Sequence, residues 1–332
     1  MTPEIVSLKD RHLEDAAALV NARYAALRAD VPSLPSRYEE SGAILPYLRD
    51  LAEKVPGVAA ICGSKLTGFL LGFVIPSFRG KRSIFSPEWA NGADLADSRR
   101  IYQEMYARLS SRWVDDGCFV HLISALANDR AGIDGWQWLG FGLIAADAVR
   151  DLEPAPDPSA DVDVRRGRLE DIEQAMALDD ALQRHLAAAP TFLPYVDMHG
   201  REYHQEWLED PANALWLAHR GAEAVAYMRL GPASTDACTI IHAETTTSIV
   251  GAFTQEHARG RGIATALLNR SLEWARSEGY ERCAVDFEPM NVLAARFWLR
   301  YFAPVCYSLV RHVDERIGRA HERREKREEP ND

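Results

Sequence analysis

Ile249-Val-Gly-Ala-Phe-Thr-Gln-Glu-His-Ala-Arg-Gly-Arg-Gly-Ile-Ala-Thr-Ala-Leu-Leu268 is the stretch that decides the fold. It begins with β-prone residues, passes two glycines, and continues into a helix whose apolar stripe predicts that it extends to Ser277. The first N–H groups of a helix lack intrahelical partners and lie at the positive end of its dipole. A strand, a glycine turn and a helix in this order therefore predict an anion site of the kind that holds a pyrophosphate.

The turn itself distinguishes between classes of phosphate loop. Gly260 and Gly262 leave room for a ligand against the backbone, and Arg259 and Arg261 add positive charge. No Lys-Ser/Thr follows the glycines, and the G-x-G-x-x-G spacing is absent, so neither a nucleoside-triphosphate loop nor a dinucleotide loop is predicted. The alternative is a tight turn that carries solvent-exposed arginines.

Arg259-Gly-Arg-Gly-Ile-Ala264 resembles the Q/R-x-x-G-x-G/A signature of the GNAT superfamily of N-acetyltransferases. Asn291-x-x-Ala294-x-x-Phe297-Trp298 lies where that family has a second helical motif. The resemblance covers residues 162–312, and more weakly the residues before them. It implies acetyl-CoA as co-substrate, with the pantetheine arm paired along Val250–Thr254 and the pyrophosphate at Arg259–Thr265. The implied cofactor-binding residues are Val250, Ala252, Phe253, Thr254, Arg259, Gly260, Arg261, Gly262, Ile263, Ala264, Thr265 and Asn291.

The resemblance also implies direct attack of an amine on the thioester. The attacking ammonium, whose pKa is about 10, must first lose a proton to a base. Glu244 is the first candidate, because it precedes Val250 by an even number of residues on one apparent β-run, although a solvated glutamate fits equally well. Asp286 and Glu288 alternate with Val285 and Phe287 further on, which fits either a wall of the acceptor cleft or a polar strand face at the end of the sheet.

The family commonly has a tyrosine seven residues after the asparagine to protonate the departing thiolate. Trp298 stands there in this sequence, so Tyr301 is predicted as the acid, with Tyr307 as an alternative. His257, just before the turn, is more typical of a surface residue than of a base. Four residues lie where the family shapes its acceptor pocket, namely Tyr195, His199, Tyr203 and His204.

The predicted acceptor is a primary amine of a small molecule or of an aminoacyl-type compound. A neighbouring possibility within the family is an enzyme that acetylates an amino-sugar thiol precursor. The alternative from another class is a non-catalytic acyl-CoA sensor or interaction module, which Trp298 at the tyrosine position would suit.

The sequence is organised as a repeat. Leu13-Glu14-Asp15 and Leu169-Glu170-Asp171 each lead into an apolar helical pattern, and Asn128–Phe141 corresponds to Asn291–Phe302. The proline-rich segment between the copies predicts a solvated linker. We expect a GNAT-like domain without a cofactor loop at 1–150, the linker at 151–161, a catalytic GNAT domain at 162–317 and a charged tail at 318–332. The predicted fold class is α/β, with two tandem domains that each have a mixed, mainly antiparallel sheet flanked by helices.

The first copy differs at the turn. The helix expected at Arg100–Trp113 follows Asn91-Gly-Ala-Asp-Leu-Ala-Asp-Ser98, which lacks the paired glycines. Asp94 and Asp97 are predicted to cap the helix and to repel phosphate. The first copy is therefore predicted to be structural.

Composition limits the remaining possibilities. The 332 residues carry a formal net charge of −11, which argues against broad binding to nucleic acid or to anionic membranes. The five cysteines are dispersed, with no C-x-x-C spacing that would indicate a metal. No signal-like start and no long apolar run are present, so a cytoplasmic monomer or homodimer is expected.

Overall fold

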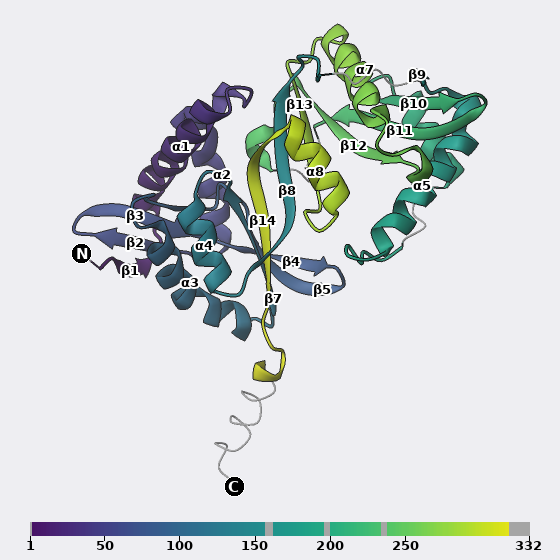
Figure 1. Ribbon diagram of the computed structural model, residues 1–332. Coiled ribbons are helices and arrows are strands. Elements are labelled where there is room, and N and C mark those ends of the chain that lie inside the picture. Colours follow the sequence, from purple (N-terminus) through teal and green to yellow (C-terminus); the bar gives the residue numbers. More distant parts are fainter. Residues whose placement is uncertain (1, 157–161, 196–199, 234–237, 319–332) are drawn as a thin grey trace.

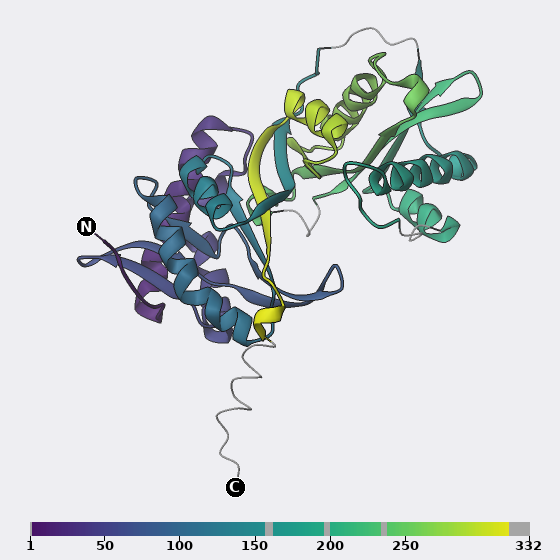
Figure 2. The same cartoon turned by 60° about the horizontal axis from the view of Figure 1, so that its bottom comes forward.

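A computed structural model describes residues 2–156, 162–195, 200–233 and 238–318 (Figure 1). We call residues 2–156 the first half and residues 162–318 the second half. The two halves lie side by side, and long strands join them (Figures 1 and 2).

The first half contains five helices and strands before an insertion of three strands, and it ends with two helices that alternate with two strands. In chain order its elements are β1 (Glu4–Ser7), α1 (Leu13–Asp30), α2 (Ser41–Lys54), β2 (Val58–Cys62), β3 (Lys65–Leu70), β4 (Phe73–Phe78), β5 (Lys81–Ser86), β6 (Asn91–Ala93), α3 (Ser98–Asp115), β7 (Val120–Leu126), α4 (Arg130–Trp138) and β8 (Gly142–Asp151).

The second half has the same order except that a single strand replaces β4 to β6. Its elements are β9 (Asp163–Arg166), α5 (Ile172–Ala187), α6 (Arg201–Glu209), β10 (Ala214–Arg220), β11 (Glu223–Pro232), β12 (Thr246–Thr254), α7 (Ile263–Ser277), β13 (Arg282–Phe287), α8 (Val292–Tyr301) and β14 (Ala303–His312). This is the order of elements that the predicted repeat requires.

The strands form a four-stranded sheet, β1-β2-β3-β6, and a ten-stranded sheet, β4-β5-β7-β14-β8-β13-β12-β11-β10-β9. Most neighbours are antiparallel, but β5 with β7 and β12 with β13 are parallel. Helices flank these mixed sheets, so the predicted fold class is confirmed.

The last strand of each half lies in the other half's part of the large sheet. β14 pairs with β7 and β8, and β8 pairs with β14 and β13. In Figure 1 both strands run through the middle of the molecule. The predicted boundaries at residues 150 and 162 therefore divide the sequence but not the sheet.

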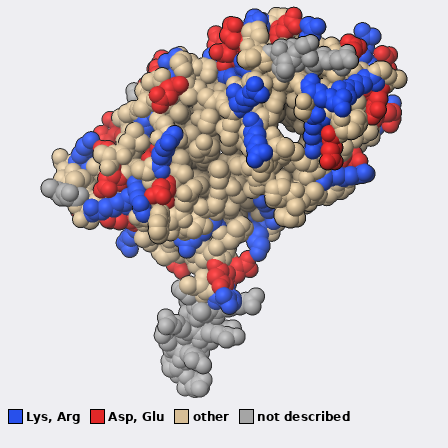
Figure 3. Space-filling model, viewed as in Figure 1, with Lys and Arg blue, Asp and Glu red and all other residues tan. Residues whose placement is uncertain are grey.

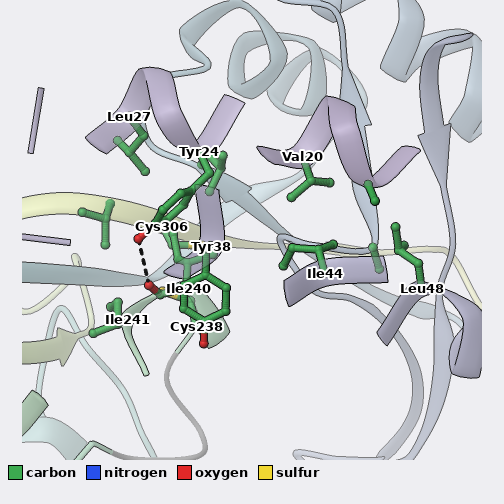
Figure 4. Close-up of a cluster of buried hydrophobic side chains, with 14 of the residues drawn as sticks. Val20, Tyr24, Leu27, Tyr38, Ile44, Leu48, Cys238, Ile240, Ile241 and Cys306 are labelled. Carbon is green, nitrogen blue, oxygen red and sulfur yellow. Dashed lines mark hydrogen bonds between the residues drawn. The ribbon is translucent and has the colours of Figure 1, made fainter. Parts of the chain in front are cut away.

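A hydrophobic core also crosses between the halves. Tyr24 and Leu27 of α1 pack in one buried cluster with Ile240 and Ile241, which form a short 3-10 turn (Thr239–Ile241) of the second half (Figure 4). The Tyr24 hydroxyl donates to the carbonyl of Ile240 at 3.4 Å. The two halves thus share apolar surface as well as strands.

Three local predictions are corrected by the structure. The β-prone composition of residues 239–254 predicts one long strand, but β12 begins only at Thr246, because the short 3-10 turn and a loop precede it. The sequence of residues 198–209 predicts a helix; the helix begins at Arg201, and residues 198–199 lie outside the described part. The predicted linker is partly buried where it begins. Ala155 is 3% exposed, its N–H donates to the Asn269 side-chain oxygen of α7, and its carbonyl accepts from the Asn269 side-chain nitrogen.

The predicted tail is described only at Gly318. Among the described helices, none combines the length and apolar composition that a bilayer crossing requires.

Candidate active site

The large sheet opens between β12 and β13. β12 pairs with β11 up to Thr254, whereas its pairing with β13 covers only Thr246–Ile249. Beyond Ile249 the described strands leave one edge of β12 without a strand partner, as far as Thr254. Backbone groups on such an edge are available to an extended ligand.

The glycine turn connects this edge to α7. Gly260 has φ 73° and Gly262 has φ 76°, both in the left-handed region that residues with a Cβ seldom adopt. Gly262 is the residue immediately before α7. The paired glycines therefore produce the sharp reversal that directs the first N–H groups of α7 toward the end of β12.

A cavity of about 820 Å³ lies at this junction. α5 contributes Leu182 and His185, and α8 contributes side chains from Leu293 to Tyr301. The predicted cofactor residues that line the cavity are Ala252, Phe253, Thr254, Arg259, Gly260, Arg261, Gly262, Ile263, Ala264, Thr265 and Asn291, and Tyr301, the predicted acid, lines it as well. The strand edge, the turn and the helix start thus face one space.

The cavity wall is positively charged. Arg220, Arg259, Arg261 and Arg300 line it, and none of the described lining residues is Asp or Glu. The Arg259 Nε donates to the carbonyl of Thr254 at 3.0 Å, which holds that side chain beside the turn. Figure 3 shows a hollow in the second half with Lys or Arg side chains beside it. Such a surface attracts anionic ligands.

The start of α8 lies opposite the turn. Asn291 is its N-cap, and the side-chain oxygen accepts from the Ala294 N–H at 3.4 Å. The same oxygen lies 3.3 Å from Nε2 of His185. Asn291 therefore links α5 to α8 at the cavity wall.

Two aromatic residues of α8 differ in their surroundings. Trp298 is 6% exposed and packs against Phe297 and Phe302 in the core, although it also reaches the cavity. The Tyr301 hydroxyl lies 3.1 Å from the Thr265 hydroxyl in the first turn of α7. A hydroxyl that can donate a proton is thus present on α8, one turn beyond Trp298.

The placement expected for Glu244 is wrong. The Thr246 N–H donates to the carbonyl of Ala243 in a turn, so Glu244 lies in that turn before β12, exposed and outside the cavity lining. The even spacing between Glu244 and Val250 places two residues on one face only within a strand, so it does not apply to a residue in a turn.

Other predicted residues also lie away from the cavity. Val250 is on β12 but 41% exposed and does not line the cavity. Asp286 is exposed on β13, and Glu288 follows the end of that strand. Tyr307 is on β14, where burial raises its pKa.

The predicted acceptor cluster is divided in the structure. His204 is buried 3.7 Å from Asp179 of α5, whereas Tyr195 is exposed and donates to Asp180. Tyr203 is exposed, and His199 lies outside the described residues. None of the described three lines the cavity.

His185 is a cavity residue that sequence reasoning missed. It follows Leu178 and Leu182 at helical spacing on α5, and its ring centre is 6.0 Å from that of Phe253 on β12. A histidine at the end of an apolar helical stripe was the available signal. The neighbouring Tyr227 is held differently, because its hydroxyl donates to the buried carboxylate of Asp179 at 2.8 Å.

A splayed sheet, a left-handed glycine turn and an arginine-lined cavity thus meet in one mixed α/β domain. Residues 181–303 match the model of the acetyltransferase (GNAT) family. The second half of the chain therefore contains a GNAT domain.

Solved structures extend the likeness to both halves. A GCN5-related N-acetyltransferase from Sphaerobacter thermophilus is 13% identical, with a TM-score of 0.55, and the match covers 94% of this chain and 97% of that one. A glucosamine N-acetyltransferase region of a fungal multi-domain β-N-acetylglucosaminidase is 12% identical, with a TM-score of 0.48, and the match covers 93% of this chain and 38% of that one. The first likeness shows that the fold is shared over nearly the whole chain. No curated protein matches the sequence.

Proposed function

We propose that the second half binds acetyl-CoA in the cavity and transfers the acetyl group to a primary amine of a small molecule. The observation that carries this proposal is the continuity of three ligand-binding features around one space. The free edge of β12 suits the amide-containing pantetheine arm, and the turn with α7 suits the pyrophosphate.

The phosphates would interact with two kinds of donor. N–H groups of the first turn of α7 supply charge-assisted hydrogen bonds, each of about 1.5–3 kcal/mol. Arg261 and Arg300 at the cavity wall add mobile charge that can follow phosphate oxygens. The arm would then extend from the turn along Thr254 toward Val250.

His185 is the best-placed base for an amine acceptor. It lines the cavity, and the Asn291 side chain lies close enough to orient its ring. An ammonium would lose its proton to the imidazole before nitrogen attacks the thioester carbonyl. A backbone N–H on the free edge of β12 would stabilise the oxyanion that then forms.

Tyr301 remains the proposed proton donor for the departing thiolate. A thiolate whose conjugate acid has a pKa of about 8.5 leaves readily, so this help is worth little compared with the base. We propose that the first half is a related, structural domain, and that the protein acts in the cytoplasm as a monomer or homodimer, without nucleic acid or membrane.

Thiol release from acetyl-CoA across a panel of amines tests the transfer. We expect turnover with at least one amine, and a fall of about 100-fold or more in kcat for His185→Gln, in line with the loss of a general base. His257→Gln, at the edge of the turn but outside the cavity lining, is the matched control.

The absence of carboxylates from the described cavity wall favours one other function, a non-catalytic acyl-CoA sensor. Binding of acetyl-CoA with no thiol release for any amine would support that function and overturn the proposed enzyme.

A further inference from the structure

A cluster of potential metal ligands lies outside the cavity lining, where strands of the two halves alternate in the large sheet. It consists of Asp147 on β8, Cys306 on β14 and Cys238 just before the short 3-10 turn Thr239–Ile241. One ligand-type atom of each lies within 4.8 Å of the others. Cys238 and Cys306 belong to the same buried cluster as Tyr24 and Tyr38, and Figure 4 labels all four.

The sheet register places these groups on one face. Cys306 is the cross-strand partner of Asp147, so their side chains project to the same side of the sheet. Cys238 lies against the same face of the sheet, and its backbone N–H donates to Asp147 Oδ1 at 3.2 Å. The arrangement depends on the exchanged strands, because β8 and β14 come from different halves.

A second carboxyl group adjoins the cluster. Glu88, 2% exposed, accepts from the Ile240 N–H at 3.1 Å, two residues after Cys238. Within the described part of the chain, no Arg, Lys or His forms an ion pair with either carboxyl group.

Burying the ionised forms of these four acidic groups without a basic partner would be costly. Buried carboxylates and thiolates in proteins are normally paired with a cation or bound to a metal. Two thiolates with a carboxylate are a ligand set that selects a soft or borderline divalent ion, and four-coordinate Zn²⁺ is bound by such sets.

We propose that Asp147, Cys238 and Cys306 bind a thiophilic divalent cation of the Zn²⁺ type, with Glu88 or a water molecule as the fourth ligand. Binding displaces the protons of both thiols, and the ion then links the exchanged strands to the 3-10 turn of the second half. The site is structural, and its occupation is independent of acyl transfer in the cavity.

Cobalt is the probe for the first test. The full chain is freed of metal with a chelator and titrated with Co²⁺, and visible ligand-field bands together with a thiolate-to-cobalt charge-transfer band are recorded. We expect saturation at one ion per chain and displacement by Zn²⁺. Absence of a charge-transfer band at any Co²⁺ concentration would overturn the proposal.

Matched variants locate the site. Cys306→Ser should weaken cobalt binding by at least about 100-fold, because even outer-shell partners of a metal are worth 10- to 100-fold. Cys283→Ser, a buried thiol on the neighbouring strand β13, should bind as the parent does. Equal spectra for both variants would refute the assignment.

A measurement on the parent chain covers the case in which Cys306→Ser does not fold. The zinc-loaded protein should show two sulfur ligands and light atoms by X-ray absorption at the zinc edge. A zinc shell of oxygen and nitrogen alone, or a Cys238–Cys306 disulfide in the protein purified without oxidant, would overturn the proposal.

Discussion

The two halves start corresponding helices in opposite ways. α7 follows Gly262 with its backbone in the left-handed region, and its first turn faces the arginine-lined cavity. α3 follows Asp97, whose side chain makes no capping hydrogen bond, and its first residue, Ser98, is fully buried.

In the first half, protein side chains occupy the space between the helix starts. Asp129, the N-cap of α4, binds Arg23 at 2.7 Å, the Ser98 hydroxyl at 2.7 Å and the Gly132 N–H at 2.8 Å. Arg23 also donates to the Tyr102 hydroxyl at 2.8 Å. The first half therefore has a buried ion pair at the helix starts, where the second half has the arginine-lined cavity.

The largest expected effect comes from opening that ion pair. Asp129→Ala should lower the free energy of unfolding by about 3–5 kcal/mol, because it leaves the Arg23 guanidinium buried without a counter-charge. Chemical denaturation measures this, and acetyl-CoA affinity should stay the same. Asp134→Ala, which breaks an exposed pair with Arg99, is the control and should cost less than about 1 kcal/mol. Equal losses for both variants would contradict the comparison.

A second effect of the first half depends on pH. His121 is fully buried, its Nδ1 lies 2.7 Å from the Tyr106 hydroxyl, and Nε2 lies 3.0 Å from the carbonyl of Cys118. Burial, helped by the charge of Arg311, lowers the pKa of His121 to about 4. As the pH drops, His121 is therefore protonated in the unfolded chain before it is protonated in the folded chain. The free energy of unfolding should decrease between about pH 6.5 and pH 4, by at most about 3 kcal/mol.

The pH profile of unfolding for His121→Gln measures this contribution. The variant should lose the decrease between pH 6.5 and 4 that the parent shows. Burial raises the pKa of Asp147 and of Glu88, so these two groups make the folded chain more stable as the pH drops. Their contribution is the same in the parent and in the variant, and it cancels when the two profiles are subtracted. Parallel profiles would mean that His121 is not the titrating group.

Gly262→Glu tests the turn of the second half. The left-handed backbone disfavours a side chain by about 1–2 kcal/mol, and a carboxylate at the helix start repels phosphate. We expect about 100-fold weaker acetyl-CoA binding by calorimetry, equivalent to about 2.7 kcal/mol. Gly279→Glu, with φ 87° just after the other end of α7, imposes the same backbone strain and should bind normally.

The smallest expected effect is that of Tyr301→Phe. Loss of the hydroxyl beside Thr265 should lower kcat less than tenfold, because the thiolate leaves readily without an acid. Steady-state kinetics at saturating acetyl-CoA measure it. A fall of 100-fold or more would make Tyr301 an essential acid.

The sequence predicted the local part of the site. The glycine turn, the start of α7 and Asn291 at the start of α8 are encoded within short segments whose backbone preferences suffice to place them. Glu244 was misplaced because the start of β12 depends on packing of Ile240 and Ile241 against the first half, which no local pattern reports.

Long-range features could not be predicted in this way. His185 reaches the cavity only because α5 packs on the face of β12 that carries Phe253. Asp147 and Cys238 are 91 residues apart, so no ligand spacing in the sequence indicated that they meet. The fold class was predictable because the order of elements is local information, whereas the exchange of strands is not.

The strand exchange has a consequence for how the chain is made. On the ribosome, the first half emerges before β14, the strand that must pair with β7 and β8. Its part of the large sheet therefore keeps an open edge until residue 312 has left the exit tunnel. At synthesis rates of about 5–20 residues per second, that edge stays unpaired for on the order of ten seconds, and during this interval it is open to pairing with other chains.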